Sequence, residues 1–152
     1  MGYKFLNKWL VVIGLGLVLS CGDIPTCVDG ETSLVKINFV DSLGNAKKIT
    51  LASLKAIGNE NGFSEYADTL IDKLALPLNP GALATTFIFE QDSAATDTIS
   101  LSYSVITSLI SPECGLDVIY SDLDTTFTSY EKLIILDLNI HEDIITNFEI
   151  TL

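Results

Sequence analysis

The sequence has no arginine, and its eight lysines face twenty acidic residues, which gives a formal net charge of −12. A chain with so few positive groups is repelled by phosphate backbones, so nucleic acid is excluded as a partner. Charged residues make up only 18% of the chain and apolar residues 48%, which excludes a disordered protein. The length of 152 residues leaves room for one ordinary domain.

The motifs of common catalytic and metal sites are also missing. There is no Gly-x-Ser-x-Gly elbow, no glycine-rich phosphate loop and no Cys-x-x-Cys pair. A zinc-protease pattern that begins at His141 fails because position 145 is isoleucine. A calcium-loop pattern that begins at Asp122 fails because Phe127 and Leu133 stand where glycine and glutamate are required. The sequence therefore predicts no catalytic residue, no metal ligand, no cofactor and no enzyme.

Two alternatives to a purely structural module stay open at this point. The acidic turns allow an irregular calcium site, built from Asp92 with Asp97 or from Asp122 with Asp124. The first alternative is therefore a β-sandwich that binds calcium or a glycan. The second is a hydrolase that uses paired carboxylates.

The N-terminus has the pattern of an export signal. Lys4 and Lys8 precede an apolar run over residues 10–19, which is about half the length needed to span a bilayer. The run ends in Val18-Leu19-Ser20-Cys21, which resembles the lipobox of bacterial lipoproteins. That resemblance implies cleavage before Cys21 and acylation of its thiol; an ordinary secreted protein cut near Ser20 is the alternative.

From this leader we predict a lipoprotein signal peptide at residues 1–20, a lipidated tether at 21–33 and a single domain at 34–152. Loss of two lysines with the leader leaves six lysines and twenty acids, a net charge of −14. We expect a cell-envelope protein that an acyl anchor on Cys21 holds in the outer membrane. Whether it faces the periplasm or the cell surface stays open.

Cys27 and Cys114 remain once Cys21 is acylated. An even number of cysteines in an oxidising compartment predicts that they form a disulfide. The bridge would close a loop of about 88 residues and contribute roughly 4 to 5 kcal/mol by the chain-entropy relation. Two free buried thiols are the alternative.

Alternating apolar and polar residues predict about seven β-strands. In the first of them, Val35, Ile37 and Phe39 are expected on one buried face. Residues 63–76 are predicted to be irregular or one short helix, and residues 121–125 to separate two strands. The expected strands cover residues 34–40, 48–57, 84–90, 98–106, 116–120, 132–138 and 144–152. This pattern predicts an all-β fold, an antiparallel, immunoglobulin-like β-sandwich.

Asp-Ser/Thr triplets with a small or aliphatic third residue occur five times, where composition alone predicts roughly one. They resemble the acceptor of periplasmic O-glycosylation in Bacteroidota. The other reading is that Asp-Ser/Thr pairs are favoured in turns before strands. The candidate acceptor hydroxyls belong to Ser42, Thr69, Ser93, Thr98 and Thr125.

Several elements of the mature chain together resemble an uncharacterised family of Bacteroidota lipoproteins of about 150 residues. They are the lipobox, Cys27, Leu34–Phe39, Leu76-Pro-Leu-Asn79, Thr85–Phe89, Asp97–Tyr103, Pro112-Glu-Cys-Gly115 and Tyr120. Residues 38–41 read Asn-Phe-Val-Asp where Phe-Tyr-Asp is expected. The resemblance implies an envelope location and a β fold, and it carries over no catalytic residue. We therefore predict a non-catalytic structural or interaction module with an envelope protein or a glycan as partner.

Overall fold

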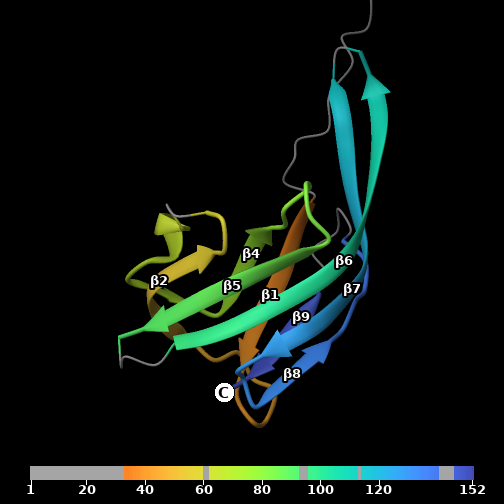
Figure 1. The fold of residues 1–152 in the computed structure, drawn as a ribbon. Coiled ribbons are helices and arrows are strands. Elements are labelled where there is room, and N and C mark those ends of the chain that lie inside the picture. Colours follow the sequence, from red (N-terminus) through yellow and green to blue (C-terminus); the bar gives the residue numbers. More distant parts are fainter. Residues whose placement is uncertain (1–32, 60–61, 93–95, 113, 141–145) are drawn as a thin grey trace, which may run out of the picture.

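The computed structural model describes residues 33–59, 62–92, 96–112, 114–140 and 146–152 (Figure 1). In these residues nine strands form two sheets, and the remaining element is one short 3-10 turn, η3, at Ser64–Tyr66. The prediction of an all-β sandwich is confirmed. The described part of the chain contains no helix long and apolar enough to cross a membrane. The predicted signal peptide and tether, apart from Ser33, lie outside the described residues.

The first sheet has four strands in the order β4-β1-β9-β8. Their bounds are β4 Lys73–Pro77, β1 Leu34–Val40, β9 Phe148–Thr151 and β8 Lys132–Ile135. β1 pairs in parallel with β9, with Ile37 opposite Phe148, whereas the other two pairings are antiparallel. The last strand of the domain is therefore inserted between the first strand and β8.

The second sheet has five strands in the order β3-β2-β5-β6-β7, and all its pairings are antiparallel. Their bounds are β3 Thr69–Ile71, β2 Ile49–Ala56, β5 Ala84–Gln91, β6 Thr96–Ser111 and β7 Gly115–Thr128. β6 and β7 are by far the longest strands, with 16 and 14 residues.

The core lies between the two sheets, as the alternation of side chains in the sequence dictates. Val35, Ile37 and Phe39 of β1 are fully buried, which confirms the face predicted for this strand. They meet aromatic and aliphatic residues of the second sheet, among them Phe87 and Phe89 of β5. Burial of these side chains is the main stabilising term for a domain of this size.

Two segments that were predicted to lie between strands contain strands. Residues 63–76, expected to be irregular or one helix, form η3, β3 and most of β4. The apolar residues there have a helix-like spacing because three short elements follow one another. These are the buried Phe63, an edge strand and a second short strand. Residues 121–125, expected to separate strands, lie inside β7, because the backbone of Asp122 adopts φ 53° and the register shifts without ending the strand. Leu123 is thereby kept in the core.

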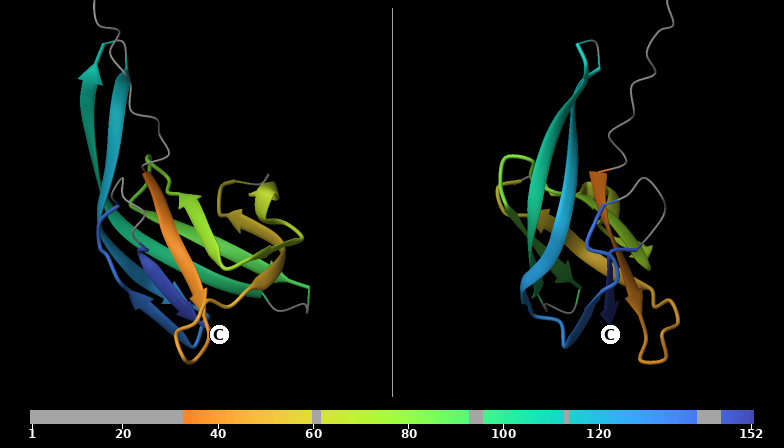
Figure 2. Two further views of the ribbon diagram at one scale, coloured as in Figure 1. Left: turned by 180° about the vertical axis from the view of Figure 1, so that it is seen from behind. Right: turned by 90° about the vertical axis from the view of Figure 1, so that its right-hand side faces the viewer.

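The long hairpin of β6 and β7 projects out of the sandwich (Figures 1 and 2). β5 accompanies β6 only as far as the pair Ala84 and Ser102, and beyond this point β6 pairs with β7 alone. We call residues 104–112 and 114–121 the arm. In all the views it stands clear of the two packed sheets.

Candidate functional site

Two tyrosines fix the arm to the sandwich at its base. The Tyr103 hydroxyl bonds to the Thr85 hydroxyl at 2.7 Å and donates to the Asn79 carbonyl at 2.9 Å. The Tyr120 hydroxyl donates to the Leu78 carbonyl at 3.2 Å. Burial, and secondarily the neighbouring Tyr103, raises the pKa of Tyr120 above its usual value. Leu78 and Asn79 belong to the Leu-Pro-Leu-Asn element of the sequence, so this element holds the base of the arm.

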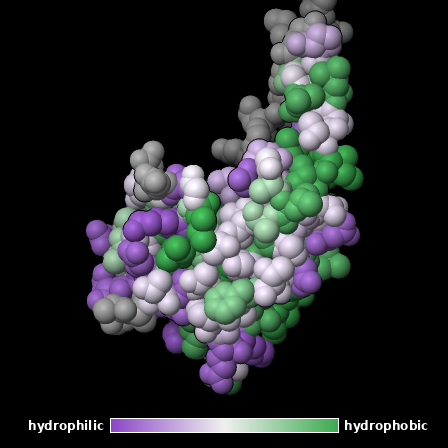
Figure 3. Space-filling model, in the orientation of Figure 1, coloured by the Kyte–Doolittle hydropathy of each residue, from purple (hydrophilic) through white to green (hydrophobic). Residues whose placement is uncertain are grey.

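Beyond the tyrosines, the arm exposes large aliphatic side chains. Ile106, Leu109, Leu116 and Ile119 are 56%, 65%, 67% and 44% exposed. Ile106 lies opposite Ile119 and Leu109 opposite Leu116 in the strand register. Side chains alternate between the faces of a ribbon, and the two pairs are three residues apart, so they occupy opposite faces. Both faces of the arm therefore carry apolar groups, and Figure 3 shows hydrophobic residues along it.

The edges of the arm are also open. Among the described residues, no third strand pairs with residues 104–111 of β6 or with residues 115–118 of β7. One contact on the β7 side is a hydrogen bond of 3.0 Å from the Ser33 hydroxyl to the Val118 carbonyl. The sequence from 104 to 121 contains no lysine, and its two charged residues are both acidic. The arm is thus an apolar, weakly acidic ribbon with main-chain groups available for pairing.

A pocket of about 300 Å³ lies on the outer face of the four-stranded sheet. Its polar lining comes from neighbouring segments and consists of Lys36, Asn38, Lys73 and Thr146. Its apolar lining is Tyr66, Leu74 and Ala75. Asn38 lies opposite Lys73 and Lys36 opposite Ala75 in the pairing of β1 with β4, so the four residues share one patch of the sheet.

Tyr66 and Thr146 are held against this patch by hydrogen bonds. The Tyr66 hydroxyl donates to the Ala75 carbonyl at 3.0 Å and accepts from the Ala75 amide at 3.3 Å. The Asn38 side-chain amide donates to the Thr146 hydroxyl at 2.8 Å. The pocket is therefore walled by fixed side chains from η3, from two strands and from the segment that precedes β9.

A second hollow of about 260 Å³ lies between the end of β2 and the loop after β4. Its lining includes Phe63, Leu78, Asn79 and Thr85, and among the described residues that line it none has a titratable side chain.

One acidic residue with partners on a neighbouring strand, Glu90, lies elsewhere, on the five-stranded sheet. Glu90 accepts hydrogen bonds from the Ser53 hydroxyl and from the Lys55 ammonium, the latter at 3.3 Å. These bonds, that of Ser53 first, hold the pKa of Glu90 below its usual value. The three residues form a cross-strand polar cluster between β2 and β5.

Three of the four acids considered for calcium, Asp97, Asp122 and Asp124, accept hydrogen bonds from local donors. Asp97 accepts from Gln91 at 3.0 Å and from Ser129 at 2.8 Å, and Asp124 accepts from the amide of Thr125 at 2.8 Å. Among the described residues, no group of three or more His, Cys, Asp or Glu side chains is placed to hold a metal ion. His141 lies outside those residues.

The other predicted site residues are distributed over the chain. Cys21, Cys27 and Ser93 lie outside the described residues, whereas Cys114 is at the tip of the arm, where its amide donates to the Ser111 hydroxyl at 3.1 Å.

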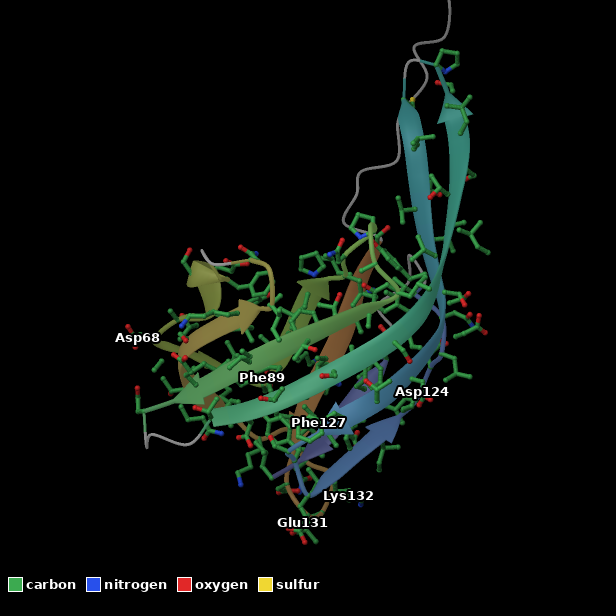
Figure 4. The ribbon with its side chains drawn as sticks, in the orientation of Figure 1. Asp68, Phe89, Asp124, Phe127, Glu131 and Lys132 are labelled. Atoms are coloured by element: carbon green, nitrogen blue, oxygen red, sulfur yellow. The ribbon has the colours of Figure 1, made fainter. Side chains whose placement is uncertain are left out.

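The remaining glycosylation candidates differ in exposure. Ser42 and Thr69 are exposed, Thr98 is half-buried, and the hydroxyl oxygen of Thr125 is buried. Asp68 and Asp124, which precede two of them, lie far apart in Figure 4. The structure thus leaves these candidates dispersed and gathers no common site from them.

Sequence reasoning missed both the arm and the pocket. The sequence predicts strands at 98–106 and 116–120. The alternation of apolar and polar residues does not indicate that these strands continue past the edge of β5. The signal that was available is the apolar character of the positions near both ends of the Pro-Glu-Cys-Gly turn, on both faces of the hairpin. For the pocket, Lys36 and Lys73 are 37 positions apart, and only the pairing of β1 with β4 joins them.

The sequence model of one protein family, described as a family of unknown function (DUF6452), matches residues 52–151. This match runs from β2 to the last residue of β9 and includes the whole arm. No curated protein and no solved structure matches the chain.

Proposed function

The chain belongs to the family of unknown function DUF6452, and from this premise we propose that it is a non-catalytic, lipid-anchored interaction module of the bacterial cell envelope. Its contact surface is the arm, and its partner is an envelope protein that offers an extended strand. We also propose that the chain is a Bacteroidota lipoprotein, and the lipobox supports this part of the proposal.

The observation that carries the proposal is the exposure of apolar side chains on both faces of the arm. A two-stranded ribbon is only marginally stable in water by itself, and it usually needs a further strand or a packed face. In the described part of the chain no third strand pairs with the arm, and only its base packs against the core, through Val105, Val118 and Tyr120. Ile106, Leu109, Leu116 and Ile119 are nevertheless more than 40% exposed. Exposed large apolar side chains gathered on one element mark contact sites for other proteins.

The open edge of the arm specifies how the partner binds. Main-chain groups along residues 104–111 of β6 can pair with an added strand, because no strand among the described residues pairs with this edge, whereas on the β7 edge the Val118 carbonyl already accepts from Ser33. The aliphatic side chains on either side supply the apolar contact. The arm has no lysine, so a partner strand flanked by Lys or Arg is favoured. A second copy of the chain is disfavoured because each mature copy would carry a net charge of −14.

The anchor and the disulfide place the arm near the membrane. We propose that Cys21 is acylated and that Cys27 pairs with Cys114. The disulfide-bonded state of Cys114 supports this pairing. Six residue steps separate Cys21 from Cys27, which span at most about 20 Å when fully extended. The disulfide adds about 6 Å, so the tip of the arm would stand within about 26 Å of Cys21, and the partner would be membrane-associated.

Site-specific photo-crosslinking in the native host tests the arm as a contact surface. A benzophenone amino acid replaces Leu116 on the arm, and in a matched control it replaces Phe127, which is 55% exposed at the other end of the same strand. We expect a discrete adduct from position 116 whose crosslinked peptide is an extended segment of one envelope protein. Adducts of equal yield at both positions, or an adduct with a second copy, would overturn the proposal.

Mass spectrometry of the membrane fraction tests the anchor separately. We expect the mature N-terminal residue to be an acylated Cys21 and the Cys21→Ala variant to leave the membrane. An uncleaved N-terminus or an unmodified Cys21 thiol would refute the anchor while leaving the crosslinking result interpretable.

A further inference from the structure

The terminal strand β4 of the four-stranded sheet carries an inference about where this chain accepts an added strand. We propose that Tyr66 caps the open side of β4 and thereby restricts strand addition to the arm. The cap itself depends on contacts that the arm does not share, whereas the role of the arm as the accepting edge rests on the proposed function.

One residue of β4 points both of its main-chain polar groups away from the sheet. β4 ends the strand order, so one of its sides has no strand partner among the described residues. Ala75 lies opposite Lys36, whose own amide and carbonyl bond to Asn147 on the other side of β1. Two opposed residues of an antiparallel pair either exchange both main-chain hydrogen bonds or make neither. The N–H and C=O of Ala75 therefore face the open side of β4.

A single hydroxyl satisfies both of these groups. The Tyr66 hydroxyl donates to the Ala75 carbonyl at 3.0 Å and accepts from the Ala75 amide at 3.3 Å. It thus makes the two bonds that an incoming strand would make at the middle of β4. The Tyr66 ring packs against the core, and the buried Phe63 fixes the start of the η3 turn that carries it. An added strand would have to displace a hydroxyl that is already held in place.

The positions on either side of Ala75 complete the protection of this edge. Main-chain groups that face one side of a strand recur at every second residue, so Lys73 and Pro77 share the open side with Ala75. Pro77 has no N–H to donate, and Lys73 has an exposed, charged side chain. Proline and lysine are residues that block edge pairing in natural sheets. The open side of β4 therefore offers no regular ladder to another strand.

The open edge of β6 in the arm has none of these features. The Tyr103 amide bonds to the Leu83 carbonyl at 3.1 Å, so alternate residues of β6 from Tyr103 onward point their main-chain groups to the side that β5 leaves. In the arm these residues are Val105, Thr107 and Leu109. None of them is proline or lysine, and no side chain in the described part of the chain bonds to their main-chain groups. The contrast between a capped edge and an uncapped one assigns the added strand to the arm.

Amide hydrogen exchange, followed by NMR on the purified full chain, tests the cap directly. Tyr66→Phe keeps the ring and removes the hydroxyl, so we expect the Ala75 amide to exchange at least about tenfold faster. Tyr130→Phe is the matched control, because the Tyr130 hydroxyl has no hydrogen-bond partner among the described residues, and it should not speed exchange at Ala75. Unchanged exchange at Ala75 in Tyr66→Phe, once thermal melts show that both variants are folded, would overturn the cap.

Sedimentation velocity tests whether the cap excludes an added strand. The triple variant Tyr66→Phe/Lys73→Thr/Pro77→Thr has an unprotected β4 edge, and we expect two copies to pair through it in about 0.5 M salt, which screens their net charge. The matched double variant Lys73→Thr/Pro77→Thr keeps the cap and should sediment as the unaltered chain does. In the triple variant, protection of the Ala75 amide should return as the protein concentration rises, because the new contact lies at β4.

Each contrary result of this second experiment refutes the restriction by Tyr66. Such results are a triple variant that stays monomeric, a double variant that associates equally, and association without renewed protection of Ala75. None of them changes the adduct expected from position 116 of the arm, so this inference and the proposed function fail separately.

Discussion

The ring of Tyr120 meets the ring of Tyr103 edge-on, with centroids 5.4 Å apart and an interplanar angle of 87°. The two residues come from adjacent strands at the level where the arm leaves the sandwich, and both are buried. Their hydroxyls donate hydrogen bonds to the carbonyls of Leu78 and Asn79, in the loop that follows β4. An edge-to-face pair adds about 0.5–1.5 kcal/mol beyond the burial of its area. This pair therefore sets the direction in which the arm projects.

Removal of the Tyr103 hydroxyl should cost more stability than removal of the Tyr120 hydroxyl. The Tyr103 hydroxyl contacts Thr85 and both the amide and carbonyl of Asn79, whereas the Tyr120 hydroxyl has one bond, to Leu78. We expect Tyr103→Phe to lower the free energy of unfolding by about 2 kcal/mol and Tyr120→Phe by about 1 kcal/mol. Urea unfolding of the two variants measures the difference, and equal losses would contradict this account.

The opposite sign is expected at Tyr130. Its hydroxyl is buried and has no hydrogen-bond partner among the described residues, while its ring packs against Phe39 and Phe89. Burial, and to a lesser extent Asp97, raises the pKa of this hydroxyl above its usual value. We expect Tyr130→Phe to keep the ring contacts and to raise the free energy of unfolding at neutral pH by about 1 kcal/mol. A loss of stability in urea unfolding would show that the hydroxyl has a partner.

Glycine is required at position 62 for two reasons and at position 44 for one. Both have positive φ, but a Cβ at Gly62 would lie 2.6 Å from the Leu54 carbonyl oxygen, whereas a Cβ at Gly44 meets nothing within 4 Å. We expect Gly44→Ala to cost about 1 kcal/mol and Gly62→Ala at least about 2 kcal/mol. Chemical denaturation of the two variants separates the effect of steric contact from that of backbone strain. Equal losses of stability would show that the contact with the Leu54 carbonyl oxygen contributes nothing.

The turn after β1 should make part of the stability depend on acid pH. The Asp41 carboxylate accepts from the amides of Leu43 and Asn45, both at 2.9 Å. These bonds, those of Asn45 first, hold its pKa below the usual value. A lowered pKa in the folded state stabilises the fold above the unfolded-state pKa, and this contribution is lost as the pH falls through the folded-state pKa. We expect Asp41→Ala to melt below the unaltered chain at pH 7, with the gap closing as the pH falls below about 4. A gap that stays constant with pH would contradict this.

The sequence alone determined the fold class and most of the strands. The alternation in Leu34–Val40 is a local property with a period of two, and it identified both the strand and its buried face. The same holds for β5, whose predicted bounds differ from those observed by one residue. The lipobox and the pairing of Cys27 with Cys114 also come from the sequence, and they remain predictions.

Tertiary structure decided which strands lie side by side and how far each continues. The parallel pairing of Ile37 with Phe148 joins residues more than 100 positions apart, and no local pattern encodes it. The end of β5 beside the middle of β6 leaves the arm projecting, and the pairing of β1 with β4 brings Lys36 and Lys73 to the lining of one pocket. Register between distant segments follows from burial in a shared core, so side-chain alternation specifies strands and faces but leaves their neighbours open.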